Sequence, residues 1–274
     1  MELFLCTNGN PATRPALEYG TWLAPRLELP ATVLGIAEKP AYRPTVRALV
    51  EEYGARLEQC GCLHQALVEE GRPRSILLRH AHPQDLVLLG PMVPSLLWGG
   101  VLSRLLAQAE FPILHTTAYR ERLENILLCT GGLHYVEALV NVLGWLAQRV
   151  GGTITLLHVV EPITLTYPLA EEIRAHWQEL PQTNTPLGHH LQAAQHSLEK
   201  QGIPVKLRIR HGTVVHEILE EIAEGDYDLV GVGSPYATRS LRRLYRPNVA
   251  LEVAEAAPCP VLIVRYRPGP FPTG

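Results

Sequence analysis

The stretch Asp228–Arg265, DLVGVGSPYATRSLRRLYRPNVALEVAEAAPCPVLIVR, decides which fold the chain is expected to adopt. Its first apolar run, Leu229–Gly233, leads into Gly-Ser and predicts a buried strand that enters a turn. A helix is expected to begin near Asn248, a residue type favoured at helix N-caps, and to end at the next proline. The run Val261–Val264 is apolar without alternation, which predicts a strand covered on both faces. The order strand, loop, helix, strand is typical of an open α/β sheet.

The chain carries the same set of short stretches twice, in the same order. The separation between matching stretches grows from 123 residues at the first pair to 148 at the last, so the second copy holds additional residues. The pattern predicts two copies of one fold: domain 1 over residues 1–120, domain 2 over 121–266, and a tail, 267–274, rich in proline and glycine. The matching pairs are LFLCTNG (Leu3–Gly9) with ILLCTGG (Ile126–Gly132), DLVLLG (Asp85–Gly90) with DLVGVG (Asp228–Gly233), and FPIL (Phe111–Leu114) with CPVL (Cys259–Leu262).

Apolar runs alternate with amphipathic helical stretches throughout both copies. This alternation predicts an α/β fold with a parallel sheet and right-handed crossovers, helices lying on both faces. The expected strands are Glu2–Thr7, Thr32–Ala37, Cys62–Val68, Leu86–Leu89 and Ile113–Thr116, then Ile126–Thr130, Thr153–Val160, Val205–Arg210, Leu229–Gly233 and Val261–Val264. The expected helices are Ala12–Leu27, Thr45–Gln59, one within Glu70–His80, Val101–Ala109, Val136–Val150, a short one at Ala170–Leu180, Leu187–Gln201, Val214–Ala223 and the one near Asn248.

Length and composition limit the class of protein. A chain of 274 residues is long enough for two small α/β cores, and its net charge of −3 argues against a nucleic-acid partner. Five cysteines without framework spacing favour a reducing compartment, and the N-terminus lacks the basic region of a signal peptide. The uncharged stretch Leu86–Ser103 is interrupted by prolines and glycines, so no membrane span is expected. We therefore expect a cytoplasmic protein.

The stretch Asp228–Arg265 resembles the C-terminal half of a universal stress protein domain. The residues that carry the resemblance are D-L-V-x-x-G-S at its front and V-A-x-x-V-x-x-x-A-P-C-P-V-L-I-V-R at its back. Since both copies share the pattern, the chain resembles a tandem universal stress protein over nearly its whole length. The resemblance implies two Rossmann-like domains, each a five-stranded, mostly parallel sheet of order 3-2-1-4-5. It also implies that the two domains pair through their last strands, and exposed last strands would favour a homodimer.

In such a sheet, ligands bind beyond the carboxyl ends of the strands where the strand order reverses. Here that crevice lies between the first and fourth strands of each domain. Helix N-termini and glycine-rich turns at this place offer free N–H groups to phosphates. The candidate ligand-binding residues are Thr130, Gly131, Gly132, Val160, His211, Gly233, Ser234 and Asn248 in domain 2, and Asn8, Gly9, Gly90, Gly99 and Gly100 in domain 1.

The ligand motif of domain 2 departs from that of ATP-binding members of the family. Those members have an acid after the first strand, a G-x-x-G turn after the fourth, and Gly-Ser or Gly-Thr at the last helix. Domain 2 keeps Gly233, but Gly131 stands at the acid position and Tyr236 at the second glycine. Gly-Ser is replaced by Pro247-Asn248, and a proline removes an N–H donor outright.

Domain 1 departs differently. Asn8 stands at the acid position and Gly99-Gly100 fits the Gly-Ser position, but Pro91–Trp98 is too short to wrap a triphosphate in the family manner. No cofactor is therefore predicted, and ATP is kept as an alternative.

An arginine-rich loop provides a second hypothesis for domain 2. Arg239, Arg242, Arg243 and Arg246 follow the fourth strand, and guanidinium groups bind phosphate bidentately. They would replace the lost glycines for an anionic ligand. The simpler interpretation, which we favour, is a solvated face or pairing with acids of the neighbouring domain.

Other candidate sites are weaker. Cys60, Cys62 and His64 resemble a soft-metal site, but one strand cannot complete tetrahedral coordination, so free thiols near a turn are favoured. The additional residues Pro162–Pro186, with Trp177, would form a lid if the protein bound another small molecule.

The function implied by the resemblance is that of a non-catalytic stress-response or regulatory protein with an unidentified protein partner. The alternatives are a nucleotide-binding protein that holds ATP, AMP or another anion at domain 2, or a nucleotide-dependent enzyme. The enzyme hypothesis requires a base and a metal site, and no acid follows either first strand.

Overall fold

The computed structural model describes residues 1–92, 100–131, 136–161, 177–234 and 249–265. The strands in these ranges are β1 (Leu3–Thr7), β2 (Ala31–Ala37), β3 (His64–Glu70), β4 (Leu86–Leu89), β5 (Ile113–His115), β6 (Asn125–Thr130), β7 (Thr153–Val160), β8 (Val205–His211), β9 (Leu229–Ser234) and β10 (Val261–Arg265). The α-helices are α1 (Arg14–Leu27), α2 (Arg43–Gln59), α3 (Pro73–His80), α4 (Val101–Leu106), α5 (Val136–Val150), α7 (Pro186–Lys200), α8 (Val214–Glu224) and α9 (Val249–Ala256). Short 3₁₀ helices are η1 (Pro11–Thr13), η2 (Pro40–Tyr42) and η3 (Trp177–Gln182).

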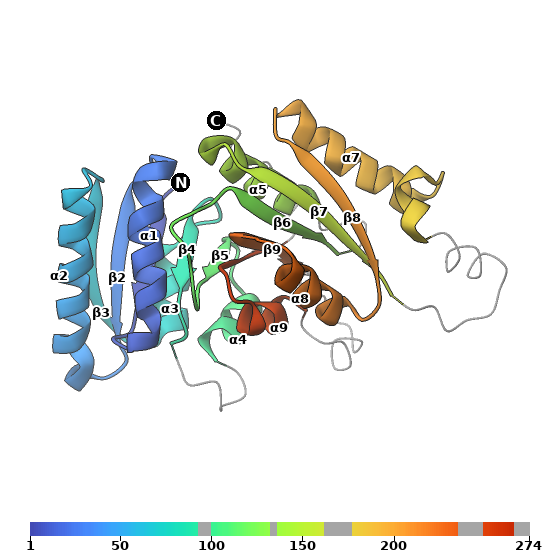
Figure 1. Ribbon diagram of the computed structural model, residues 1–274. Coiled ribbons are helices and arrows are strands. Elements are labelled where there is room, and N and C mark those ends of the chain that lie inside the picture. The colour runs from blue at the N-terminus through green and yellow to red at the C-terminus, as the bar shows by residue number, and fades with distance from the viewer. Residues whose placement is uncertain (93–99, 132–135, 162–176, 235–248, 266–274) are drawn as a thin grey trace.

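These strands form one continuous ten-stranded sheet of order β3-β2-β1-β4-β5-β10-β9-β6-β7-β8 (Figure 1). Within each domain the strands are parallel and follow the order 3-2-1-4-5 from the outer edge inward, which confirms the predicted fold class. The domains meet where β5 and β10 pair antiparallel, with Leu114 opposite Leu262. Because this pairing reverses the strand direction, the carboxyl ends of the two sets of strands point to opposite edges of the sheet.

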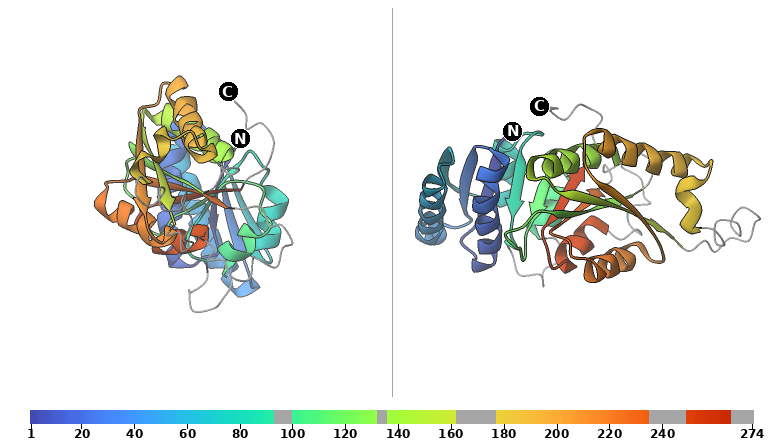
Figure 2. Two further views of the ribbon diagram at one scale, coloured as in Figure 1. Left: turned by 90° about the vertical axis from the view of Figure 1, so that its right-hand side faces the viewer. Right: turned by 45° about the horizontal axis from the view of Figure 1, so that its top comes forward.

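Helices cover both faces of the sheet and form two apolar layers that run through both domains. One buried cluster joins residues of α1, α2, α5 and α7, and the other joins residues of α3, α4, α8 and α9. The right-hand view of Figure 2 shows α5 and α7 on one side of the domain 2 strands and α8 and α9 on the other. Burial on both faces explains why the central strands read as unbroken apolar runs.

The residues between β5 and β6 hold the domains together. The Tyr119 ring lies 5.6 Å from the ring of Tyr19 on α1, measured between centroids. Across the same junction, Arg149 Nη1 donates a hydrogen bond of 2.9 Å to the Leu27 carbonyl. These contacts pack the two domains closely against each other.

The reason given for a homodimer is wrong, and the homodimer itself stays a prediction. Exposed last strands were expected to favour a homodimer, but β5 lies between β4 and β10, and β10 lies between β5 and β9. Their backbone groups are used within the chain, so neither strand offers a free edge. The outer strands of the sheet are β3 and β8.

Several element boundaries differ from the prediction for local reasons. The first helix is preceded by η1, and β3 begins two residues later than expected because the Cys62 N–H bonds the Leu57 carbonyl in the cap of α2. α4 ends at Leu106 rather than Ala109, where a tighter turn follows. The predicted helix Ala170–Leu180 lies partly outside the described residues, and its described part belongs to the 3₁₀ helix η3. Asn248 and the tail also fall outside them.

A bilayer-spanning helix, one both long and apolar enough, does not occur among the described residues.

Candidate functional site

The crevice of domain 1 lies where β1 and β4 are neighbours. The chain leaves β1 toward β2 on one side and leaves β4 toward β5 on the other, so the sheet changes direction here. Thr7, Asn8 and Gly9 stand at the carboxyl end of β1, and Gly90 follows the end of β4. The structure therefore brings these predicted residues together at the switch point.

A chain of hydrogen bonds folds the loop after β1 back onto the strand. The Gly9 N–H donates to Thr7 Oγ1 at 3.1 Å, and Thr13 Oγ1 donates to the Asn10 carbonyl at 2.7 Å. Thr13 has a single hydroxyl hydrogen, so in the 2.7 Å contact between the two threonine oxygens Thr7 must donate. Both hydroxyls are fully buried and fully used. Gly9 has φ +85°, a left-handed conformation that favours glycine in this turn.

Asn8 closes the crevice from the opposite side. Its Nδ2 donates to the Met92 carbonyl at 2.6 Å and to Glu38 Oε1 at 3.1 Å, while its Oδ1 accepts from the Asn10 N–H at 3.2 Å. The bond to Met92 joins the ends of β1 and β4. An ionised acid at this position would have no hydrogen to donate and would face both the Met92 carbonyl and Glu38. Asparagine thus stabilises a contact that the acid of ATP-binding members would not make.

Gly90 fixes how closely the loop approaches the sheet. A Cβ atom placed on Gly90 would lie 2.7 Å from Thr13 Cα and 2.8 Å from the Ala12 carbonyl oxygen. The backbone of η1 therefore packs directly on the end of β4. Gly100 caps α4, where its carbonyl accepts the Arg104 N–H, and Gly99 lies outside the described residues. Among the described residues, the ends of β1 and β4 are thus held against each other and against η1.

In domain 2, the end of the first strand makes different contacts from those in domain 1. Thr130, at the end of β6, donates from Oγ1 to the Leu157 carbonyl at 3.1 Å and lies 2.9 Å from His158 Nδ1. His158 is buried, and burial lowers its pKa, an effect that the hydrogen bond with Thr130 opposes and the nearby His190 increases. His158 is thus held in place by Thr130 on the neighbouring strand.

The remaining predicted residues of domain 2 are only partly described. Gly131 is exposed, and a Cβ placed on it would meet nothing within 4 Å. Val160, His211, Gly233 and Ser234 lie at the carboxyl ends of β7, β8 and β9, next to Thr130 at the end of β6. Gly132, Arg239, Arg242, Arg243, Arg246 and Asn248 lie outside the described residues. Among the described residues, the space beside Gly131 in domain 2 is open, whereas the space beside Gly90 in domain 1 is occupied by η1.

Sequence reasoning missed three residues that shape these crevices. Thr13 and Met92 close domain 1, and no local signal identifies them because each acts on a residue brought near only by the fold. Gly212 follows β8 with φ +157°, and its N–H donates to the Val160 carbonyl at 3.0 Å. Its counterpart in domain 1 is Gly71, with φ +142° and a bond to Ala37. Aligning the two copies of the repeat at the turn after the third strand would have identified Gly71 and Gly212 as matching residues.

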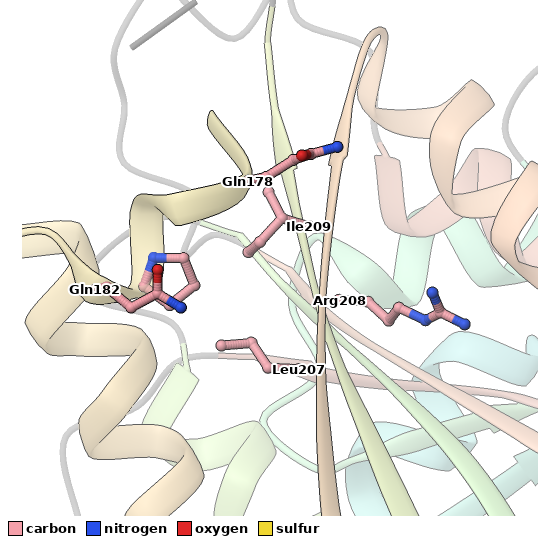
Figure 3. A pocket seen from close by; sticks show the side chains of 6 residues that line it. Gln178, Gln182, Leu207, Arg208 and Ile209 are labelled. Carbon is pink, nitrogen blue, oxygen red and sulfur yellow. The ribbon is translucent and has the colours of Figure 1, made fainter. Parts of the chain in front are cut away.

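A hollow of about 300 Å³ lies beside domain 2, away from the strand ends named above. Figure 3 shows Gln178 and Gln182 of η3 facing Leu207 and Ile209 of β8, while Arg208 points to the other side of the strand. The hollow is lined by the two glutamine amides on one side and by aliphatic side chains on the other. The described lining holds no group of charged side chains that would bind a phosphate. Only the last part of the proposed lid, Pro162–Pro186, lines this hollow, because residues 162–176 lie outside the described ranges. The lid therefore stays a prediction.

Metal ligands are not gathered in the described part of the chain: no group of three or more His, Cys, Asp or Glu side chains there is arranged to hold an ion. The His64 ring, two residues after Cys62, lies with Nδ1 3.3 Å from the Cys62 carbonyl.

Comparison with known proteins agrees with this architecture. A universal stress protein from Synechocystis sp. is 26% identical over 159 residues, which are 52% of this chain and 55% of that protein, so the chain spans about half the length of this relative. A solved universal stress protein from Archaeoglobus fulgidus aligns with a TM-score of 0.70 at 15% identity, over 96% of this chain and 98% of that one. A protein of unknown function from Pseudomonas aeruginosa PAO1 aligns with a TM-score of 0.66 at 14% identity, over 96% and 92%. At these identities the structural likeness shows the fold alone.

The model of the Universal stress protein family matches residues 122–265, which include all of domain 2 from β6 to β10. Since the match covers more than half of the chain, and both the repeated sequence and the strand order agree with it, the chain belongs to the universal stress protein family.

Proposed function

We propose that this chain is a non-catalytic regulatory protein of the stress response that does not hold ATP in the manner of the family's ATP-binding members. The observation that carries the proposal is the closed crevice of domain 1. The Asn8–Met92 bond and the close approach of η1 to Gly90 support it, because they tie together the strand ends beside which a nucleotide would bind. Opening the crevice would break the buried Thr7–Thr13 bond as well. Each such bond contributes about 1 kcal/mol, and an unpaired buried hydroxyl costs more.

Domain 2 carries an alternative, which is binding of ATP, AMP or another anion. The observation in its favour is Gly131, which is exposed and has open space above it at the switch point. Arg242 and Arg243 would supply the positive charge that the missing glycines do not. This alternative predicts a single ligand per chain, bound by domain 2, with weak hydrolysis or none.

Thermal unfolding of the full chain with and without millimolar ATP–Mg²⁺ tests the proposal, with AMP and inorganic phosphate as further probes. A ligand present at a hundred times its Kd adds about 2.7 kcal/mol to the free energy of unfolding. For a chain of this size, that raises Tm by about 5 °C or more. We expect no rise with ATP–Mg²⁺, and no nucleotide in the mass spectrum of the purified protein.

The matched variants separate the two functions. If a rise occurs, it should disappear in the double variant Arg242→Ala/Arg243→Ala and persist in Arg120→Ala, which removes an arginine from the linker between the domains. That result would establish the alternative. A rise that survives the double variant would mean that the arginines do not hold the ligand, and it would contradict the closed crevice of domain 1.

A further inference from the structure

Cys60, Gly61 and Cys62 form a tight turn, here called the dithiol turn, between α2 and β3 at the outer edge of the sheet. It is the C-terminal cap of α2: the Gly61 N–H bonds the Glu58 carbonyl and the Cys62 N–H bonds the Leu57 carbonyl, both at 2.9 Å. Gly61 has φ +69°, so it is left-handed and turns the chain back on itself. From helical geometry, Cα atoms flanking one such residue lie about 5.4 Å apart. A disulfide requires a Cα separation of about 4.4–6.8 Å.

The two thiols of the dithiol turn differ in accessibility. Cys60 is exposed, whereas Cys62 is half-buried, with its Sγ 3.3 Å from the Leu29 carbonyl. Burial, and then the neighbouring Cys60, raise the pKa of Cys62. A Cβ built on Gly61 would meet nothing within 4 Å, so the outer side of the turn is open to a small molecule. The following residue, Leu63, is 78% exposed.

The other three cysteines lie in a different environment. Cys6, Cys129 and Cys259 are buried, and burial raises the pKa of each thiol, that of Cys259 to about 12. These three thiols are inert because, unlike Cys60 and the half-buried Cys62, they are out of reach of an oxidant and their reactive thiolate form is disfavoured. An oxidant in solution therefore meets the dithiol turn and not the other cysteines.

We propose that Cys60 and Cys62 form a reversible intramolecular disulfide by exchange with a small-molecule disulfide. The exposed Cys60 thiolate attacks one sulfur of the small disulfide, whose S–S bond breaks and releases one thiolate. The Cys62 thiolate then attacks Cys60 Sγ in the resulting mixed disulfide, which forms the Cys60–Cys62 bond and releases the second thiolate. The two protein thiols lose two electrons and two protons, and the small disulfide gains them as two thiols.

The geometry favours a labile bond over a structural one. A disulfide across a single residue closes a very short loop, so it restricts the unfolded chain little and stabilises the fold little. Exposed or strained disulfides are also the more easily reduced ones. A third metal ligand is lacking among the described residues around the turn, which favours thiol exchange over metal binding. The dithiol turn is thus a site for reversible oxidation in a reducing compartment.

The test uses the full reduced chain, oxidised glutathione as the probe and intact mass as the readout. The wild type should lose two hydrogens per chain, about 2 Da, with the mixed disulfide below about a tenth of the protein. Native alkylation should then find both thiols of the turn blocked, and glutathione should restore them. In Cys62→Ser the reaction should stop at one glutathione per chain, whereas in Cys60→Ser it should be at least about tenfold slower.

Cys259→Ser is the matched control and should behave as the wild type. A wild-type product that keeps its glutathione would overturn the proposal, as would disulfide-linked dimers in place of the intramolecular bond. Peptide mapping that places the first oxidation at Cys6, Cys129 or Cys259 would overturn it as well.

Discussion

Gly90 is the residue whose lack of a side chain matters most to the crevice of domain 1. An alanine there would place its Cβ 2.7 Å from Thr13 Cα and 2.8 Å from the Ala12 carbonyl oxygen, and both are backbone atoms that cannot rotate away. We expect Gly90→Ala to lower the free energy of unfolding by about 1–3 kcal/mol, the range for overpacking a close contact. Urea denaturation monitored by circular dichroism measures the change.

Gly131 is the matched control for this prediction. A Cβ at this position meets nothing within 4 Å, so Gly131→Ala should show no loss of stability beyond about 0.5 kcal/mol. If Gly90→Ala were as stable as the wild type, η1 would not pack tightly on β4. The closed crevice, and the proposed function that depends on it, would then be wrong.

At the scale of elements, the sequence predicted long periodic segments best. The bounds of β4, β7 and α5 agree with the prediction to the residue, because each is an unbroken apolar or amphipathic run between turn residues. The start of β3 was predicted two residues too early. The Cys62 N–H bonds the Leu57 carbonyl at the end of α2, and the hydrophobic pattern does not reveal this bond. The strand-end residues of the candidate site were likewise predictable from the repeat. The closing contacts Asn8–Met92 and Gly90–Thr13 were not, because they join segments that are far apart in the chain.

An aspartate before the fourth strand of each domain holds the start of that domain's first strand. Asp85 Oδ1 accepts the Glu2 N–H at 2.9 Å, and Asp228 Oδ2 accepts the N–H groups of Glu124 and Asn125 at 2.9 and 3.0 Å. The Asp228 side chain is fully buried, so Asp228→Ala would leave these amides without an acceptor. We expect a loss of roughly 2–5 kcal/mol in the free energy of unfolding, measured by urea denaturation.

The neighbouring Asp226 tests whether this loss comes from burial or from charge. Its side chain is 58% exposed and pairs with Arg120 and Arg122, and the bonds from these arginines lower its pKa. Asp226→Ala should cost far less than Asp228→Ala, because water screens an exposed pair. Both aspartates also pair with Arg122, Asp228 through Nε at 2.7 Å and Asp226 through Nη2 at 2.6 Å. Equal losses from the two variants would therefore mean that these arginine pairs, and not the buried amide bonds of Asp228, hold β6 to β9.

At the scale of the whole molecule, the sheet and both apolar layers continue across the domain boundary. His115 lies at this boundary. It ends β5 of domain 1, is 6% exposed, and its Nδ1 lies 3.1 Å from the Ala254 carbonyl of α9 in domain 2. Burial lowers its pKa, and the bond to the Ala254 carbonyl opposes this shift. The lowered pKa means that burial outweighs this bond, so folding favours the neutral form of the ring.

The pH dependence of stability follows from the lowered pKa of His115. A histidine whose pKa is lower in the folded state binds fewer protons when folded, so its contribution is intact above its ordinary pKa of about 6.5 and is lost as the pH falls through the folded value. One such group adds a slope of at most about 1.4 kcal/mol per pH unit. We expect His115→Gln, whose amide can still donate to Ala254, to unfold with a shallower dependence on pH between about 7 and 5. Denaturant midpoints measured across this range give the slope.

His158→Gln is the comparison within domain 2. It should also reduce the slope of stability against pH, because burial lowers the pKa of His158 too. A His115→Gln slope equal to that of the wild type would mean that His115 binds protons equally well in the folded and unfolded chain, and that the domain boundary does not sense pH through this residue.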